Sequence, residues 1–148
     1  MVVRVERAVE VPAPIEQVWA FISDPEKRSR PISVVEDFEL LDSGEAVWHI
    51  KLPLPVVNKT APVETTEKTR DPPRYVEFVG DSRLMRVIGE HELEDLGGST
   101  RLTNRFVVDG NLPGVERFFK RNMPEEFDNL IEALYEDLGL ETDALDHG

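Results

Sequence analysis

Apolar and polar residues alternate from the start of the chain. Four valines between positions 3 and 11 fall on one side of an extended chain, and charged residues fall on the other. Because successive side chains of a strand point to opposite faces, this pattern predicts a half-buried strand over residues 3–11. Arg7 interrupts the apolar face. We expect its side chain to reach the sheet edge or to pair with a glutamate, and the alternative is that it binds a ligand carboxylate.

Two short helices are expected after this strand. A Pro-Ala-Pro segment at 12–14 ends the strand. Four apolar residues then have the spacing of one helix face: Ile15, Val18, Trp19 and Ile22. Asp24 followed by Pro25 is typical of a helix N-cap and first turn, so a second short helix is predicted to run to about residue 30.

Residues 34–109 have a period of two. The candidate strands are 34–42, 45–52, 62–70, 74–80, 84–95 and 100–109. The connections are short and carry turn residues, which indicates antiparallel neighbours. The segment that contains Leu54–Val57 differs, because it is apolar and rich in proline. It is either a pocket lid or a docking surface for a second copy or another protein, or it packs back on the body.

The period changes to 3.6 residues at Leu112. The pattern predicts one helix over Leu112–Leu138, kinked at Pro124 and ended by Gly139. Its apolar stripe consists of Val115, Phe118, Phe119, Met123, Phe127, Leu130, Ile131, Leu134 and Leu138.

This order of elements predicts an α+β helix-grip fold. A curved, seven-stranded antiparallel sheet would wrap around the long C-terminal helix, with the two short helices after the first strand closing one end. An apolar pocket is expected between the sheet and the helix. We expect a single domain over residues 1–140, followed by a flexible acidic tail over 141–148.

Two polar residues are expected on the inner face of this sheet. Because the glutamates at 90, 92 and 94 share the solvated face, alternation places His91 inward, and the same logic places Asn104 inward. They either orient a ligand oxygen or bond to each other or to water. From the ordinary pKa of histidine we expect His91 to titrate near neutral pH, so it could act as an acid or base. No second catalytic group is placed beside it, so no catalytic residue is assigned.

The candidate ligand-binding residues share this inward phase, although for the apolar ones plain core is the better explanation. They are Trp19, Phe38, Trp48, Ile50, Met85, His91, Asn104, Phe106, Phe118, Met123 and Phe127. No cofactor is expected, and the chain has no glycine-rich phosphate loop. It also lacks the Gly-x-Ser-x-Gly motif that positions the nucleophile of many hydrolases. No metal site is expected, because the three histidines lack metal-ligand spacing.

Composition excludes several classes of function. The chain has no cysteine, so disulfides and thiolate chemistry are excluded. With 30 acidic and 17 basic residues its net charge is −13, which disfavours binding to nucleic acid. The acidity indicates adaptation to high salt or, alternatively, simple solubility. No apolar run is long enough to cross a bilayer and the N-terminus carries charge early, so we expect a cytoplasmic location.

Several short motifs resemble one known superfamily. They are Val9-Glu10-Val11-Pro12-Ala13-Pro14, Val18-Trp19, Asp24-Pro25, Asp71-Pro72-Pro73-Arg74 and the hairpin segment 97–103. Together they resemble the polyketide cyclase/dehydrase and START-like superfamily, which includes the birch-pollen-allergen-like proteins, over residues 3–138. Many relatives have an aromatic residue just after the second short helix, where this chain reads Arg28-Ser29-Arg30-Pro31-Ile32. The mouth of the pocket is therefore expected to differ.

The resemblance implies a pocket and leaves the reaction open, because the superfamily includes carriers, receptors, cyclases and hydrolases. The leading hypothesis is binding or carriage of a small hydrophobic ligand such as a lipid, a quinone or a polyketide-like compound. One alternative is a polyketide cyclase or dehydratase that uses the same pocket. Another is an accessory subunit that docks a larger complex through Leu54–Val57.

Overall fold

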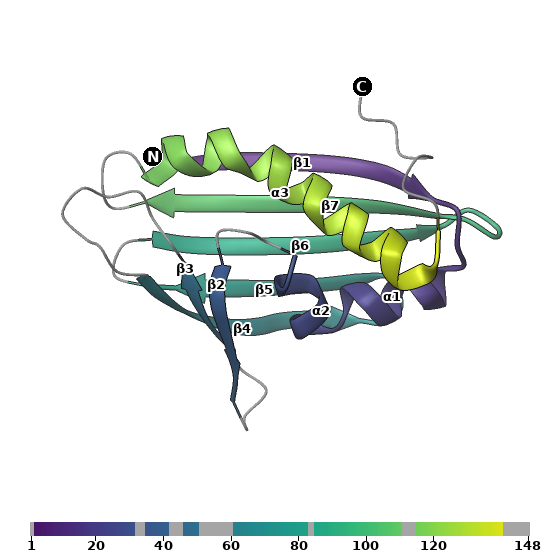
Figure 1. Cartoon of the computed structure of the whole chain (residues 1–148), viewed down its shortest axis with the longest axis horizontal. Helices are drawn as coiled ribbons and strands as arrows, with labels where there is room; N and C mark the ends of the chain where they lie inside the picture. The colour runs from purple at the N-terminus through teal and green to yellow at the C-terminus, as the bar shows by residue number, and fades with distance from the viewer. Residues whose placement is uncertain are drawn as a thin grey trace.

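The computed structural model describes residues 2–31, 35–41, 46–50, 61–82, 85–110 and 115–140. Within these ranges the chain forms seven strands and three helices (Figure 1). In chain order they are β1 (Val2–Val11), α1 (Ile15–Ile22), α2 (Pro25–Ser29), β2 (Val35–Leu40), β3 (Ala46–Ile50), β4 (Ala61–Asp71), β5 (Tyr75–Asp81), β6 (Met85–Asp95), β7 (Thr100–Gly110) and α3 (Val115–Leu138).

The strands form one antiparallel sheet in the order β1-β7-β6-β5-β4-β3-β2. Strands β2 to β7 are neighbours in chain order, and β7 then pairs along its whole length with β1, from Val2 opposite Asp109 to Val11 opposite Thr100. The helix α3 crosses the sheet over β1 and β7, and α1 and α2 lie at one end (Figure 1). This arrangement is the predicted helix-grip fold.

The predicted elements agree with the observed ones to within one or two residues wherever the structure describes them. Asp24 caps α2, because its Oδ1 accepts hydrogen bonds from the backbone N–H groups of Glu26 (2.9 Å) and Lys27 (3.4 Å). The helix α3 continues through Pro124 and ends at Leu138, and the φ of 72° at the following Gly139 is the left-handed value expected of a glycine after a helix C-terminus. The kink at Pro124 stays a prediction. Residues 54–57 and the tail 141–148 lie outside the described residues.

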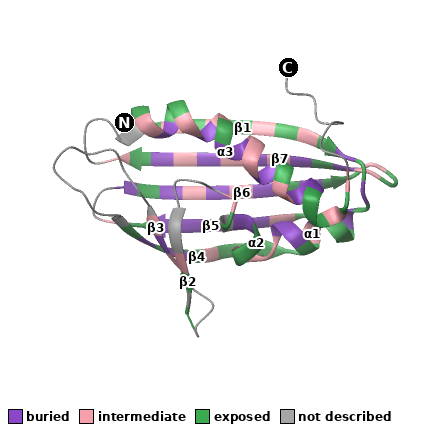
Figure 2. Ribbon diagram, viewed as in Figure 1, coloured by how far each residue is buried: buried purple, intermediate pink, exposed green. Residues whose placement is uncertain are grey.

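The core lies between the sheet and α3 and divides into two groups of buried side chains (Figure 2). The aromatic cluster consists of Ala46, Trp48, Val63, Phe78, Met85, Val87, Phe106, Val108, Phe119, Met123 and Phe127. The helical cluster, which includes α1, consists of Val11, Ala13, Ile15, Val18, Phe21, Ile22, Val76, Leu93, Leu102, Leu130, Ile131, Leu134 and Tyr135. The first half of α3 thus packs in one cluster and its second half in the other.

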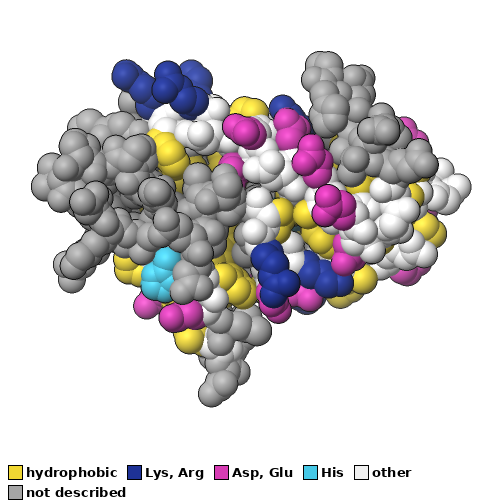
Figure 3. Space-filling view, viewed as in Figure 1, with side chains coloured by type: hydrophobic (Ala, Val, Ile, Leu, Met, Phe, Trp, Pro, Cys, Tyr) yellow, Lys and Arg dark blue, Asp and Glu magenta, His cyan; other side chains and the backbone are white. Residues whose placement is uncertain are grey.

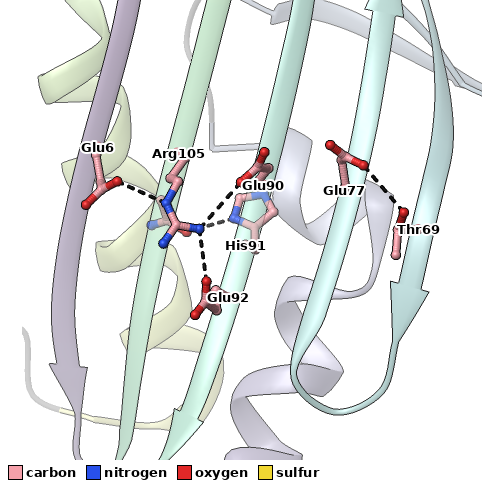
Figure 4. Close-up of polar contacts among 8 residues, drawn as sticks. Glu6, Thr69, Glu77, Glu90, His91, Glu92 and Arg105 are labelled. Atoms are coloured by element: carbon pink, nitrogen blue, oxygen red, sulfur yellow. Dashed lines mark hydrogen bonds and ion pairs between the residues drawn. The ribbon is translucent and has the colours of Figure 1, made fainter.

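The outer surface is charged on both sides of the molecule. On the face seen in Figure 3, basic side chains gather near the start of α3 and acidic ones follow towards its end. On the far face of the sheet, Arg105 joins three strands (Figure 4). Its guanidinium donates to Glu6 (2.9 Å), to Glu92 (3.0 Å) and to Glu90 (3.4 Å). One cation therefore offsets three carboxylates that would otherwise repel one another.

Arg105→Met is expected to lower the free energy of unfolding by about 1 kcal/mol at low salt, because three glutamates lose their shared cation. At ~1 M KCl the Debye length falls to about 3 Å, so most of this loss should disappear. Urea unfolding of both chains at low and high KCl measures the effect. The matched control is Arg86→Met, which removes a single exposed pair with Asp81. A loss in Arg105→Met that KCl leaves unchanged would contradict the electrostatic explanation.

No helix in the described part of the chain is both long enough and apolar enough to span a membrane.

Candidate functional site

A row of polar residues crosses the middle of the inner sheet face. Asn104 on β7 lies opposite Arg7 on β1 and opposite His91 on β6, and His91 in turn lies opposite Val76 on β5. Glu90 and His91 are consecutive residues of β6 and point to opposite faces (Figure 4). His91 is 5% exposed and Asn104 is 1% exposed, so both are buried as alternation predicts.

This polar row separates the two apolar clusters. Along β6, Met85 and Val87 belong to the aromatic cluster, and Leu93 belongs to the helical cluster, with His91 between them. Along β7, Phe106 and Val108 belong to the first and Leu102 to the second, with Asn104 between them. His91 and Asn104 therefore form a polar layer inside an otherwise apolar core, and we call this site the polar layer.

His91 and Asn104 satisfy only half of each other's hydrogen-bonding capacity. The Nδ1–H of His91 donates to the Oδ1 of Asn104 over 2.7 Å. This bond leaves His91 Nε2 as an acceptor and Asn104 Nδ2 as a donor, and both atoms are buried without a partner in the part of the chain that the structure describes. A buried polar atom without a partner costs about 1–3 kcal/mol, and a water molecule or a ligand oxygen that bonds to these atoms would remove this cost.

Arg28 brings a positive charge to this layer from α2. Its side chain is 5% exposed, and its Nη1 donates to the carbonyl of Ile22 over 3.1 Å. The guanidinium carbon lies 4.9 Å from the centre of the Phe78 ring, within range of a cation–π contact. Like the two atoms above, its Nε is buried without a hydrogen-bond partner among the described residues.

Phe78 is the common neighbour of these groups. Its ring packs edge-on against Trp48, with centroids 5.0 Å apart, and stacks towards the His91 ring at 6.2 Å. Gly89 lies opposite Phe78 on β6 and lets the ring settle onto the strand, because a Cβ at this glycine would lie 2.2 Å from the ring. The absence of a side chain at Gly89 thus leaves space for the Phe78 ring, on which Arg28 packs.

Burial sets the charge of both ionisable groups. Burial is the main reason that the pKa of His91 is lowered to about 3, the Arg28 charge contributes to this lowering, and the hydrogen bond that His91 donates to Asn104 opposes it. The expectation that His91 titrates near neutral pH is therefore wrong. Burial also lowers the pKa of Arg28 to about 10, against an opposing effect of Glu67. At neutral pH the layer therefore holds a neutral imidazole acceptor and a protonated guanidinium donor.

Most of the candidate ligand-binding residues gather in one place. Trp48, Met85, Phe106, Met123 and Phe127 are buried in the aromatic cluster, and Phe38 and Phe118 pack against it. Whether they contact a ligand stays a prediction.

Trp19 and Ile50 are the exceptions. Trp19 packs instead against the helical cluster, partly exposed, with the Arg70 guanidinium 5.7 Å from its ring. The side chain of Ile50 lies outside the described residues, as does the whole segment Leu54–Val57.

Two site residues, Arg28 and Phe78, are absent from the candidates that the sequence provides. Phe78 follows the same alternation as Val76 in a predicted strand, so its inward phase was available. The sequence indicated the burial of Arg28 only weakly. Pro25 is the one apolar residue of α2, so a helix packed on the body must turn a long polar side chain inward.

Arg7, also on the inner face, has protein partners. Its Nη1 donates to the carbonyl of Pro124 over 3.2 Å and forms an ion pair with Asp128. The expectation that this residue pairs with an acidic side chain is confirmed, with an aspartate of α3 in place of the expected glutamate. Its Nη1 is therefore engaged with α3.

An open cavity of about 470 Å³ lies elsewhere, where β5 begins and β6 ends. Its lining consists of Arg74, Tyr75, Glu92, Leu93, Glu94 and Asp95. Three carboxylates and one apolar side chain make this lining unsuited to a hydrophobic molecule. Among the described residues, no group of three or more His, Cys, Asp or Glu side chains is arranged to hold a metal ion.

Comparison with known proteins points to one family. The family model described as polyketide cyclase / dehydrase and lipid transport matches residues 2–135. No curated protein sequence matches the chain significantly.

Solved structures share the fold at low sequence identity. The Zhui aromatase/cyclase of Streptomyces sp. R1128 is 16% identical with a TM-score of 0.72, over 97% of this chain and 99% of its own. A START superfamily protein of Mycobacterium smegmatis is 18% identical with a TM-score of 0.68, over 88% and 93%. Truncated norcoclaurine synthase of Thalictrum flavum is 12% identical with a TM-score of 0.64, over 95% of each chain. At these identities the likeness shows the helix-grip fold and no more.

Proposed function

Since the chain belongs to the polyketide cyclase / dehydrase and lipid transport family, we propose that it binds a small, largely hydrophobic molecule between the sheet and α3. The oxygen-bearing end of the molecule would lie at Arg28, His91 and Asn104. The observation that carries this proposal is that three polar side-chain atoms of the described residues are buried without partners inside an apolar core. The aromatic cluster on one side of them would contact the rest of the ligand.

The polar layer defines what the ligand must offer. Arg28 Nε and Asn104 Nδ2 are donors, so they need an accepting oxygen. His91 Nε2 is an acceptor, so it needs a hydroxyl hydrogen. The apolar remainder would contribute roughly 25 cal/mol for each Å² of its surface removed from water. Affinity would therefore come mainly from the aromatic cluster, and orientation from the polar layer.

Cyclase or dehydratase chemistry is the second candidate, and one observation favours it. His91 is neutral with a free Nε2, and two hydrogen-bond donors belong to the same layer. A neutral imidazole can remove a proton beside a carbonyl group while donors stabilise the oxyanion that forms. This reaction would use the same pocket and the same orientation of the substrate, so it presupposes the binding site proposed above.

A neutral probe, methyl 3-hydroxydecanoate, is expected to change the surroundings of Trp48 and to leave those of Trp19 nearly unchanged. Trp48 contacts Phe78 in the aromatic cluster, whereas Trp19 lies with the helical cluster. These are the two tryptophans of the chain, so a 5-fluorotryptophan-labelled protein gives two ¹⁹F resonances. The expected result is a saturable shift of the Trp48 resonance during titration.

Trp19→Phe and Trp48→Phe assign the two resonances and act as matched controls. The shift of the Trp48 resonance should remain in Trp19→Phe, whereas the spectrum of Trp48→Phe should lack the shifting resonance. A probe that shifts neither resonance, or that shifts Trp19 alone, would contradict a pocket at the aromatic cluster.

A further inference from the structure

Among the residues that the structure describes, Arg28 is a buried cation without an anionic partner. Its contacts in the described structure are the Ile22 carbonyl and the face of the Phe78 ring. Neither contact carries a full negative charge. Its Nε has no hydrogen-bond acceptor in the described part of the chain, although Arg28 is only 5% exposed.

The two carboxylates that act on Arg28 from a distance are both engaged elsewhere. Glu67 is held by Arg70, whose Nε lies 2.9 Å from Glu67 Oε2 and whose Nη2 pairs with Oε1. Asp24 caps α2 through its Oδ1. Both raise the pKa of Arg28 only through space. The chain has 30 acidic residues, yet none of those described forms an ion pair with this guanidinium.

A lone buried charge is costly, and replacing it by an apolar residue of similar size is often neutral or stabilising for the protein alone. A bound anion would therefore compensate the buried charge of Arg28. Asn104 could donate a second hydrogen bond to the same anion. His91 donates a hydrogen bond to Asn104 Oδ1, and the Nδ2 of the same amide has no partner among the described residues.

His91 restricts the anion further. Its neutral Nε2 would repel a bare carboxylate oxygen, because both are acceptors. A hydroxyl group close to the carboxylate removes this conflict by donating to Nε2. The polar layer thus matches a charged acceptor group together with one neighbouring hydroxyl donor.

Resting on the proposed function, we infer that the ligand is an amphipathic hydroxy acid. Its carboxylate accepts from Arg28 and Asn104, its hydroxyl donates to His91, and its apolar chain lies along the aromatic cluster. Because charge-assisted hydrogen bonds contribute about 1.5–3 kcal/mol, the carboxylate should bind about 10- to 100-fold more tightly than its neutral ester.

The test compares 3-hydroxydecanoate with its methyl ester, which differ in charge and share the hydroxyl and the chain. Dissociation constants come from the ¹⁹F titration of Trp48 or from calorimetry. The wild-type chain is expected to prefer the acid by at least about tenfold, and Arg28→Met to bring the ratio of the two constants close to one. The matched control is Arg30→Met, which removes an exposed arginine of the same segment that pairs with Glu26. It should leave the ratio unchanged.

The outcomes separate this inference from the proposed function. Ester and acid binding equally to the wild-type chain would overturn the inference and leave the pocket standing. Failure of both to shift Trp48 would overturn both. Decanoate binding as tightly as 3-hydroxydecanoate would overturn the role of the hydroxyl. Should Arg28→Met not fold, the wild-type preference and Arg28→Gln still decide the question.

Discussion

Gly89→Ala is expected to lower the free energy of unfolding by about 2 kcal/mol or more, which is large for the addition of one methyl group. The new Cβ would lie 2.2 Å from Cε1 and 2.3 Å from Cζ of the Phe78 ring, far inside contact distance. The ring has little room to withdraw, because Trp48 and Arg28 also pack on it. Urea unfolding of the variant and of the wild-type chain measures the loss.

A double-mutant cycle tests whether Phe78 is the cause. Phe78→Leu alone should destabilise the chain, because the ring loses its contacts with its aromatic neighbours. In the Gly89→Ala background the same change should cost less, since a smaller side chain relieves the clash. A coupling of about 0.5–3 kcal/mol is expected. Strict additivity of the two changes would show that the clash is relieved elsewhere.

The sheet and the long helix could be predicted because each buries one face, and a buried face leaves a periodic pattern in the sequence. His91 is a clear case. Its burial followed from the glutamates on either side of it, which belong to the solvated face. Asn104 followed from the apolar neighbours at 102 and 106 in the same way. Strand alternation is local, so no knowledge of the tertiary structure was needed.

The place of Arg28 and Phe78 in the site could not be predicted, because it depends on contacts between distant parts of the chain. The five-residue helix α2 is too short for a hydrophobic pattern to fix its orientation. Arg28 is buried only because α2 places it over Phe78, fifty residues later, and Phe78 is accommodated by Gly89 in the next strand. The ion pair of Arg7 with Asp128 spans 121 positions. Residue type and spacing do not encode such pairs.

Acid is expected to destabilise the protein through His91 before most carboxylates titrate. Burial and the Arg28 charge lower the pKa of His91 from 6.5 to about 3 in the folded chain, whereas unfolding restores the ordinary value. Between these two pKa values the unfolded chain binds one more proton at this residue than the folded chain does. The free energy of unfolding that the lowered pKa of His91 contributes is therefore fully present above about pH 6.5 and is lost as the pH falls towards 3.

The expected slope is about 1.4 kcal/mol per pH unit below about pH 6, from this residue alone. Urea unfolding between about pH 6.5 and 4.5 measures it in a range where carboxylates with ordinary pKa values remain mostly ionised. His91→Gln is the matched variant, because it keeps a polar side chain and removes the titration. A constant cost of the substitution cancels, since the comparison uses slopes. Equal slopes in the two chains would mean that folded His91 takes up its proton as readily as the unfolded residue. The polar layer would then be open to water, and Arg28 would no longer require an anion from a ligand.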